Sequence, residues 1–159
     1  MALKSSRGDG GNPHFAGGPA KVNRLYVTAI THLSVDVEHH VSTADHRLLR
    51  RILRDYRTRG FSAEDTLERW PLVQAREEKY IFPFQEEANF CINTALLYEL
   101  PILANYVRPL LAEVHGLPGV EMEAERLLNF LNLFYPMTDE MVPANSILRE
   151  FCGHSAFQY

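Results

Sequence analysis

The sequence has few of the features that mark several large classes of protein. Its two cysteines, Cys91 and Cys152, lie far apart and match no metal-binding or redox motif. No apolar run approaches the roughly 20 residues that span a bilayer, and the start has no signal-peptide pattern. A formal net charge of −4 excludes a general attraction to nucleic acid or anionic lipid. By elimination, these absences predict a cytoplasmic protein with reduced thiols that binds neither membrane nor nucleic acid.

The first 23 residues have little apolar content and hold five of the nine glycines. This composition predicts a flexible leader or a cloning remnant over residues 1–23, followed by one folded unit over residues 24–159. None of the early glycines precedes Lys-Ser or Lys-Thr, so the phosphate-binding loop G-x-x-x-x-G-K-[S/T] does not occur. Phosphoryl transfer by that route would need residues that this sequence does not contain.

Apolar patterning predicts a mostly helical α/β fragment. Leu25–Ile30 is apolar nearly throughout, which is typical of a strand buried on both faces of a parallel sheet. Phe90–Ile92 predicts a short second strand, and two strands alone do not form a stable sheet. A helix that begins at Ser62 should be kinked or divided at Pro71. Helical period and capping residues predict the other helices over residues 42–60, 96–114, 121–135 and 145–153.

One predicted helix has an unusually cationic face. At 100° per residue, five arginines of this helix fall within about a third of its circumference. Its apolar residues fall on the opposite side. The arginines are Arg47, Arg50, Arg51, Arg54 and Arg57, with Arg59 just beyond, and the apolar residues are Leu48, Leu49, Ile52, Leu53 and Tyr56.

This arginine stripe has two interpretations, a solvated polar face or an anion site. A solvated face usually mixes lysine with glutamate, because like charges repel. Here the face is all arginine, with Asp55 at its edge. Since guanidinium groups bind phosphate oxygens through paired hydrogen bonds, the stripe favours a site for a nucleotide phosphate.

The other titratable residues are not predicted to form a functional site. Four histidines near the start of the same helix invite a metal site, but adjacent His39 and His40 are poorly placed to share one ion, so no metal site is predicted. These histidines are expected to be solvated loop residues. They are His32, His39, His40 and His46.

The acidic and aromatic residues beyond the stripe are also expected to be structural. Tyr98 is predicted in the core and Glu99 on the surface, whereas Trp70, Phe82 and Phe84 are predicted as core or domain-contact residues. The remaining glutamates are predicted to face solvent. They are Glu77, Glu78, Glu86 and Glu87.

The stripe carries a recognisable motif. Residues 45–55 follow the pattern D-x-R-L-x-R-R-x-x-R-D, and Arg59-Gly60 supplies the R-G pair that comes after it. This segment resembles the lid of the uridine kinase and phosphoribulokinase-like family. Further stretches, in the same order, resemble the bacterial long-chain branch of that family. They are Trp70, residues 81–88 (IFPFQEEA), Tyr98-Glu99-Leu100 and residues 143–151 (PANSILREF).

The resemblance implies the C-terminal part of a P-loop kinase fold, with a late strand, the lid and a helical tail. It implies an ATP-dependent enzyme that uses Mg²⁺ and moves the γ-phosphate to a hydroxyl of a nucleoside. It also implies that Arg51 faces the nucleoside. The arginines implied to hold ATP phosphates are Arg47, Arg50, Arg54 and Arg59.

The sequence departs from the family pattern at several positions. Phe61 stands where the family has an arginine and Arg69 where it has a glutamine, which weakens the case for uridine as substrate. Asn89 replaces a usual aspartate, and Gly153-His154 replaces a glycine pair. The catalytic residues of the family find no counterpart and stay unknown.

Three hypotheses follow from the sequence. The first is a lid-bearing portion of a uridine or nucleoside kinase, inactive alone without its phosphate-binding loop. Its exposed strand should lead to self-association or to pairing with a missing N-terminal half. The second is a non-catalytic protein that binds nucleotide or phosphate. The third is a helical dimer whose arginines pair with acids of a second copy.

Overall fold

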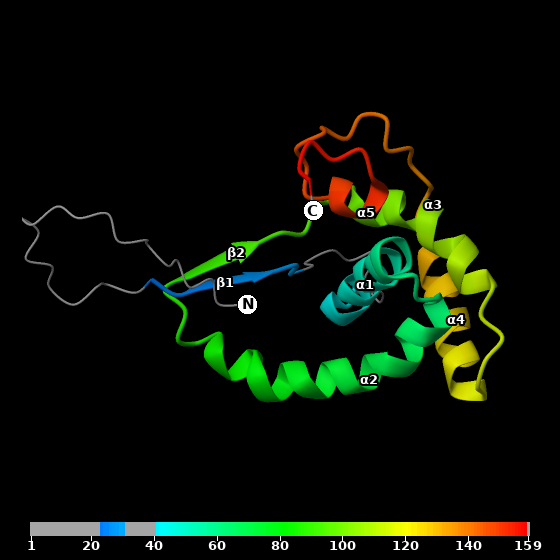
Figure 1. Cartoon of the computed structure of the whole chain (residues 1–159), viewed down its shortest axis with the longest axis horizontal. Coiled ribbons are helices and arrows are strands. Elements are labelled where there is room, and N and C mark those ends of the chain that lie inside the picture. The colour runs from blue at the N-terminus through cyan, green and yellow to red at the C-terminus, as the bar shows by residue number, and fades with distance from the viewer. Residues whose placement is uncertain (1–22, 31–40, 159) are drawn as a thin grey trace, which may run out of the picture.

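The computed structural model describes residues 23–30 and 41–158 of the chain. The predicted leader, residues 1–23, lies almost wholly outside this range, and so do His32, His39 and His40. Within it, five helices and a short 3₁₀ turn accompany two strands (Figure 1). The predicted fold class, mostly helical α/β with two strands, is confirmed. The elements are β1 (Leu25–Thr28), α1 (Thr43–Arg59), α2 (Ala63–Tyr80), η1 (Phe82–Phe84), β2 (Phe90–Asn93), α3 (Glu99–Ala112), α4 (Pro118–Leu131) and α5 (Arg149–Cys152).

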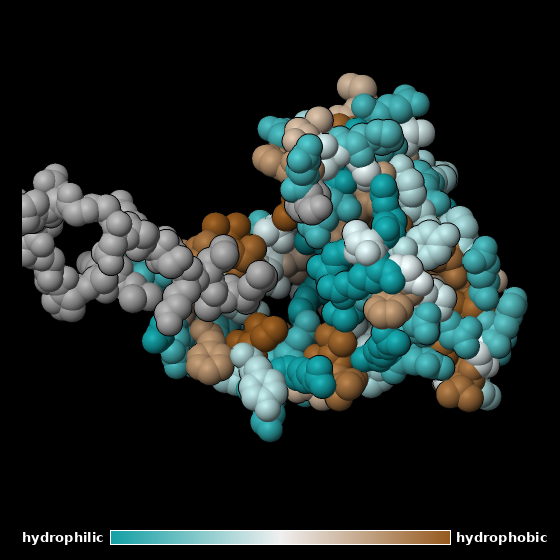
Figure 2. All heavy atoms as spheres, viewed as in Figure 1, coloured by the Kyte–Doolittle hydropathy of each residue, from teal (hydrophilic) through white to brown (hydrophobic). Residues whose placement is uncertain are grey.

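The two strands pair in parallel, with Leu25 beside Phe90 and Val27 beside Ile92. All four of these side chains are exposed, so the prediction that the first strand is buried on both faces is wrong. Alternate residues of a strand point to opposite faces, and among the described residues nothing buries the face that carries these four. Figure 2 shows apolar surface where the strands lie.

Helix α1 begins and ends where its capping residues predict. The Ser42 hydroxyl accepts a hydrogen bond from the Ala44 N–H at 3.2 Å, and Gly60 adopts the left-handed conformation, with φ of 68°. The apolar face of α1 is buried in the main core, as predicted, except at Tyr56, which is half-exposed near the C-terminal end. This burial fixes which way the arginine stripe points.

Helix α2 starts with a full capping box, because the Ser62 and Asp65 side chains each accept a hydrogen bond from the other's backbone N–H. Pro71 does not divide the helix, which is continuous from Ala63 to Tyr80 and curves along its length (Figure 1). A proline removes one backbone donor and its ring crowds the preceding turn. A bend in the helix relieves this crowding without breaking the helix. Trp70 is buried, as predicted.

Helices α3 and α4 pack against one another and against α1 and α2 to form the core (Figure 1). Pro101 lies in the first turn of α3, where no backbone donor is needed, and α3 continues through Pro109. Helix α4 starts at Pro118, three residues before the predicted Glu121. The Arg108 guanidinium on α3 donates to the carbonyl oxygens of Leu131, the last residue of α4, and of Phe134 just beyond it, which ties the end of α4 to α3.

No helix in the described parts of the chain is long and apolar enough to cross a membrane. The cysteines there, Cys91 and Cys152, are both free thiols, as predicted. Burial and the nearby Asp139 raise the pKa of the Cys152 thiol to about 11. The Cys152 thiol is therefore protonated at neutral pH.

Candidate phosphate-binding pocket

The carboxyl ends of both strands point towards α1 and α5 (Figure 1). A pocket of about 260 Å³ lies there, at the edge of the sheet where open α/β folds bind their ligands. Residues from both strand ends, α1, α2 and α5 form its wall. They are Val27, Thr28, Ala29, Arg47, Arg50, Arg51, Arg54, Trp70, Glu77, Thr94, Ile147, Glu150 and Phe151.

The helix α1 brings four of the five predicted ligand-binding arginines into this pocket, three predicted for phosphate and one, Arg51, for the nucleoside. Arg47, Arg50, Arg51 and Arg54 all line it, whereas Arg59 does not. Their convergence follows from the amphipathic pattern of α1, whose apolar face is anchored in the core. Because the four come from three successive turns of one helix, their spacing is fixed by the helix itself.

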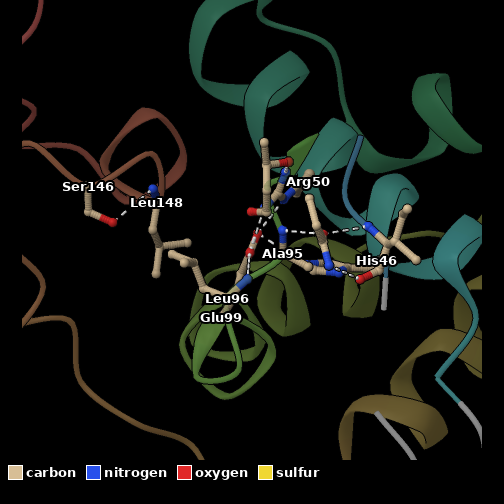
Figure 3. A network of polar contacts seen from close by, with 10 residues as sticks. His46, Arg50, Ala95, Leu96, Glu99, Ser146 and Leu148 are labelled. Carbon is tan, nitrogen blue, oxygen red and sulfur yellow. Dashed lines mark hydrogen bonds and ion pairs between the residues drawn. The ribbon is translucent and has the colours of Figure 1, made fainter. Parts of the chain in front are cut away.

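Arg50 is held by the side chain of Glu99, at the start of α3 (Figure 3). Both carboxylate oxygens of Glu99 accept from Arg50, the Oε2 atom at 2.6 Å. Arg50 also donates to the Thr94 backbone oxygen at 2.7 Å and to the Thr94 hydroxyl at 3.2 Å. The His46 Nε2 atom lies 3.1 Å from Glu99 Oε1. This buried cluster ties α1 to the segment that joins β2 to α3.

Glu99 is fully buried yet stays an acid that ionises easily. Burial by itself raises the pKa of Glu99, but hydrogen bonds from His46 and Arg50 outweigh burial, so that the pKa lies below its ordinary value of 4.5. The carboxylate also accepts from the Leu96 N–H at 3.3 Å, which satisfies a backbone donor at the start of α3. Glu99 is therefore a charged residue of the core.

This cluster overturns two predictions from the sequence. Glu99 was expected on the surface and Tyr98 in the core, but Glu99 is buried and Tyr98 is exposed. His46 was expected in a solvated loop, but it lies in α1 and is buried beside Glu99. His46 and Arg50 are four residues apart, so one turn of helix brings both to the same carboxylate.

Asp55 is a second buried carboxylate, and it serves three arginines. It accepts from Arg59 at 2.9 Å, and it lies 3.2 Å from the Arg51 Nε atom and 3.9 Å from the Arg54 Nε atom. Asp55 lies beside the stripe, and its burial was not predicted from the sequence. One carboxylate shared by three guanidinium groups leaves them with surplus positive charge.

The Glu77 side chain on α2 pairs with Arg47. Glu77 was expected to face solvent, but its side chain is mostly buried between α1 and α2. A second pocket, of about 390 Å³, lies on the other side of this pair and shares Thr28, Arg47 and Glu77 with the first. The pair therefore separates two neighbouring hollows.

Other candidate residues lie away from the pocket. Phe82 and Phe84 were predicted as core or domain-contact residues; both are exposed, so they are not core residues, and contact with another domain stays a prediction. Phe61 and Arg69, the two departures from the family pattern, contact each other, with the Arg69 guanidinium 4.2 Å from the centre of the Phe61 ring. Neither of them lines either pocket. In residues 23–30 and 41–158, no three His, Cys, Asp or Glu side chains are grouped to hold a metal ion.

An arginine-lined pocket at the carboxyl ends of parallel strands belongs to the class of sites suited to phosphorylated ligands. The family model for the phosphoribulokinase / uridine kinase family matches residues 21–97, which include both strands, α1 and α2. Over this segment, a little under half of the chain, the sequence is similar to that family. No match was found among curated proteins or among solved structures.

Proposed function

We propose that this chain is the lid-bearing portion of an ATP-dependent kinase that phosphorylates a hydroxyl of a nucleoside or a related sugar. The match of residues 21–97 to the phosphoribulokinase / uridine kinase family model supports the reaction class. The observation that carries the proposal is the convergence of Arg47, Arg50, Arg51 and Arg54 in one pocket at the ends of the strands.

The charge of the pocket suits a phosphate that must be held and then released. Four arginines line the pocket and Arg59 lies outside it; with the four carboxylates in the lining or paired with these arginines, the whole cluster keeps one net positive charge. Guanidinium groups fixed in this way would stabilise the negative charge that spreads over the transferred phosphoryl group in the transition state. The four carboxylates are Asp55, Glu77, Glu99 and Glu150.

The same chain is proposed to be inactive on its own. Family chemistry uses ATP with Mg²⁺ and a glycine-rich loop around the β- and γ-phosphates. The sequence contains no G-x-x-x-x-G-K-[S/T] motif. The other hypothesis, a phosphate-binding protein without catalysis, predicts the same pocket and differs only in whether a fuller protein would transfer phosphate.

Calorimetric titration of the chain with ATP tests the proposal. We expect saturable binding that weakens as salt rises, because the contacts are between charges. Reversing two pocket charges in Arg51→Glu/Arg54→Glu should abolish it, whereas Arg76→Glu, an exposed residue of α2 outside both pockets, should leave it unchanged. Absence of ATP binding by the unaltered chain would reject the pocket as a phosphate site. Phosphorylation of uridine by this chain alone would reject the claim that it is inactive.

A further inference from the structure

The arginines of the pocket differ in how many of their N–H groups are already used. A guanidinium group carries five N–H bonds. Arg50 makes four hydrogen bonds, two to Glu99 and two to Thr94. Its side chain is also the least exposed of the four, at 12%. Arg50 has little left to offer a ligand.

Arg51 and Arg54, in contrast, have most of their N–H groups unused. Their only polar contacts within the described part of the chain run from their Nε atoms to Asp55, at 3.2 Å and 3.9 Å. The terminal nitrogens, which form the fork that grips phosphate, have no partner there. Their side chains are 26% and 36% exposed, and both line the pocket. Asp55 therefore lies within ion-pair distance of both Nε atoms, without a hydrogen bond to Arg54, and the terminal nitrogens stay open to a ligand.

We propose that Arg51 and Arg54 bind the phosphate and that Arg50 is a positioning residue, committed to Glu99 and Thr94. The assignment rests on the proposed phosphate pocket, and it divides the arginine stripe into two roles. Glu99 and Arg50 fix how α1 is oriented about its own axis, and where it lies along that axis, relative to the segment between β2 and α3. Asp55 provides a negative charge beside the Nε atoms of the two ligand arginines.

This division differs from what the family resemblance implies. There, Arg50 closes over the phosphates and Arg51 faces the nucleoside. Arg50 keeps one N–H free, so a phosphate that bound it through two hydrogen bonds would have to displace at least one bond that Arg50 donates to Glu99 or Thr94. Binding at Arg51 and Arg54 breaks no hydrogen bond among the described residues.

Matched variants separate the two roles, with inorganic tripolyphosphate as the titrant in calorimetry. Arg51→Met and Arg54→Met should each weaken binding by about tenfold or more, the worth of a charged hydrogen bond. The double variant Arg50→Met/Glu99→Met removes both partners together, which avoids leaving a buried charge unpaired. It should bind tripolyphosphate within about threefold of the unaltered chain, because less than 1 kcal/mol is at stake.

A second set of variants guards against misfolding of the double variant. Arg50→Lys keeps a cation beside Glu99 and should leave the affinity for tripolyphosphate within about threefold, whereas Arg51→Lys and Arg54→Lys lose the planar fork and should weaken binding. If the Arg50 variants lose as much affinity as the Arg51 variants while unfolding at normal temperatures, the division of roles is wrong and the pocket stands. If the unaltered chain does not bind tripolyphosphate, the phosphate pocket itself is wrong, and the division fails with it.

Discussion

Arg47 on α1 and Glu77 on α2 form an ion pair that stands between two neighbouring pockets. Both residues line the pocket with the other arginines, so Glu77 neutralises a guanidinium that would otherwise face a ligand. A carboxylate in this position competes with phosphate for the same N–H donors. Glu77 is therefore expected to limit how tightly the pocket holds an anion.

Replacing Glu77 should strengthen anion binding. In Glu77→Gln the side chain keeps its size but loses its charge, which frees Arg47 for the ligand. We expect the affinity for tripolyphosphate to rise by about threefold, the scale of one partly screened charge interaction. Glu68→Gln makes the same charge change at an exposed position of the same helix and should have no effect. Equal gains in both variants would show a general charge effect instead.

Removing the Glu99 carboxylate should strongly destabilise the fold. Glu99→Ala leaves Arg50 buried without its main partner, and breaking a buried pair from one side costs about 3–5 kcal/mol. Urea unfolding followed by circular dichroism measures the change in the free energy of unfolding. Glu125→Ala, on the exposed side of α4, provides the matched control. A decrease in the free energy of unfolding of less than about 1 kcal/mol is what removal of a surface ion pair would cause. Such a result would contradict the role of Glu99 in the core.

The same carboxylate should make stability depend on acid pH. The pKa of folded Glu99 lies below its ordinary value of 4.5, because hydrogen bonds from His46 and Arg50 outweigh the effect of burial. The ionised carboxylate therefore contributes stability above pH 4.5, and this contribution is lost as the pH falls from 4.5 through the folded pKa. The free energy of unfolding should fall more steeply below pH 4.5 in the unaltered chain than in Glu99→Gln. Parallel curves for the two proteins would show that Glu99 does not titrate in this range.

Two glycine-to-alanine changes should have effects of opposite sign. Gly60 ends α1 with φ of 68°, so Gly60→Ala strains the backbone and should cost about 1 kcal/mol. Gly119 lies in the first turn of α4 with free space around an added Cβ, and Gly119→Ala should gain up to about 0.5 kcal/mol. Thermal unfolding of both variants gives the comparison. A melting temperature unchanged in Gly60→Ala would show that the left-handed cap is not what makes Gly60 necessary, and a lower one in Gly119→Ala would contradict the free space found at Gly119.

Local patterns predicted most of the helices, because a cap or a helical period needs only neighbouring residues. The helix α1, its cap at Gly60 and the convergence of its arginines all follow from a sequence window of under 20 residues. The strands could be located in the same way. Their exposure could not be predicted, since burial of a strand depends on what other elements cover it.

The pairing within the site was beyond the reach of local patterns. Arg50 and Glu99 are 49 residues apart, and no periodicity links them. The one signal available was the spacing of His46 and Arg50, a histidine and an arginine on the same side of one turn, which favours a shared acidic partner. Asp55 was visible in the sequence, but its burial depends on how α1 packs in the core.

The most direct test of the account follows the arginine side chains themselves. Nuclear magnetic resonance of the chain labelled with ¹⁵N resolves the arginine Nε–H groups during a titration with tripolyphosphate. We predict that the resonances of Arg51 and Arg54 shift with saturation, while those of Arg76 and Arg126, outside the pocket, stay in place. Saturable shifts confined to arginines outside the pocket, with Arg51 and Arg54 unchanged, would contradict the claim that this pocket binds phosphate.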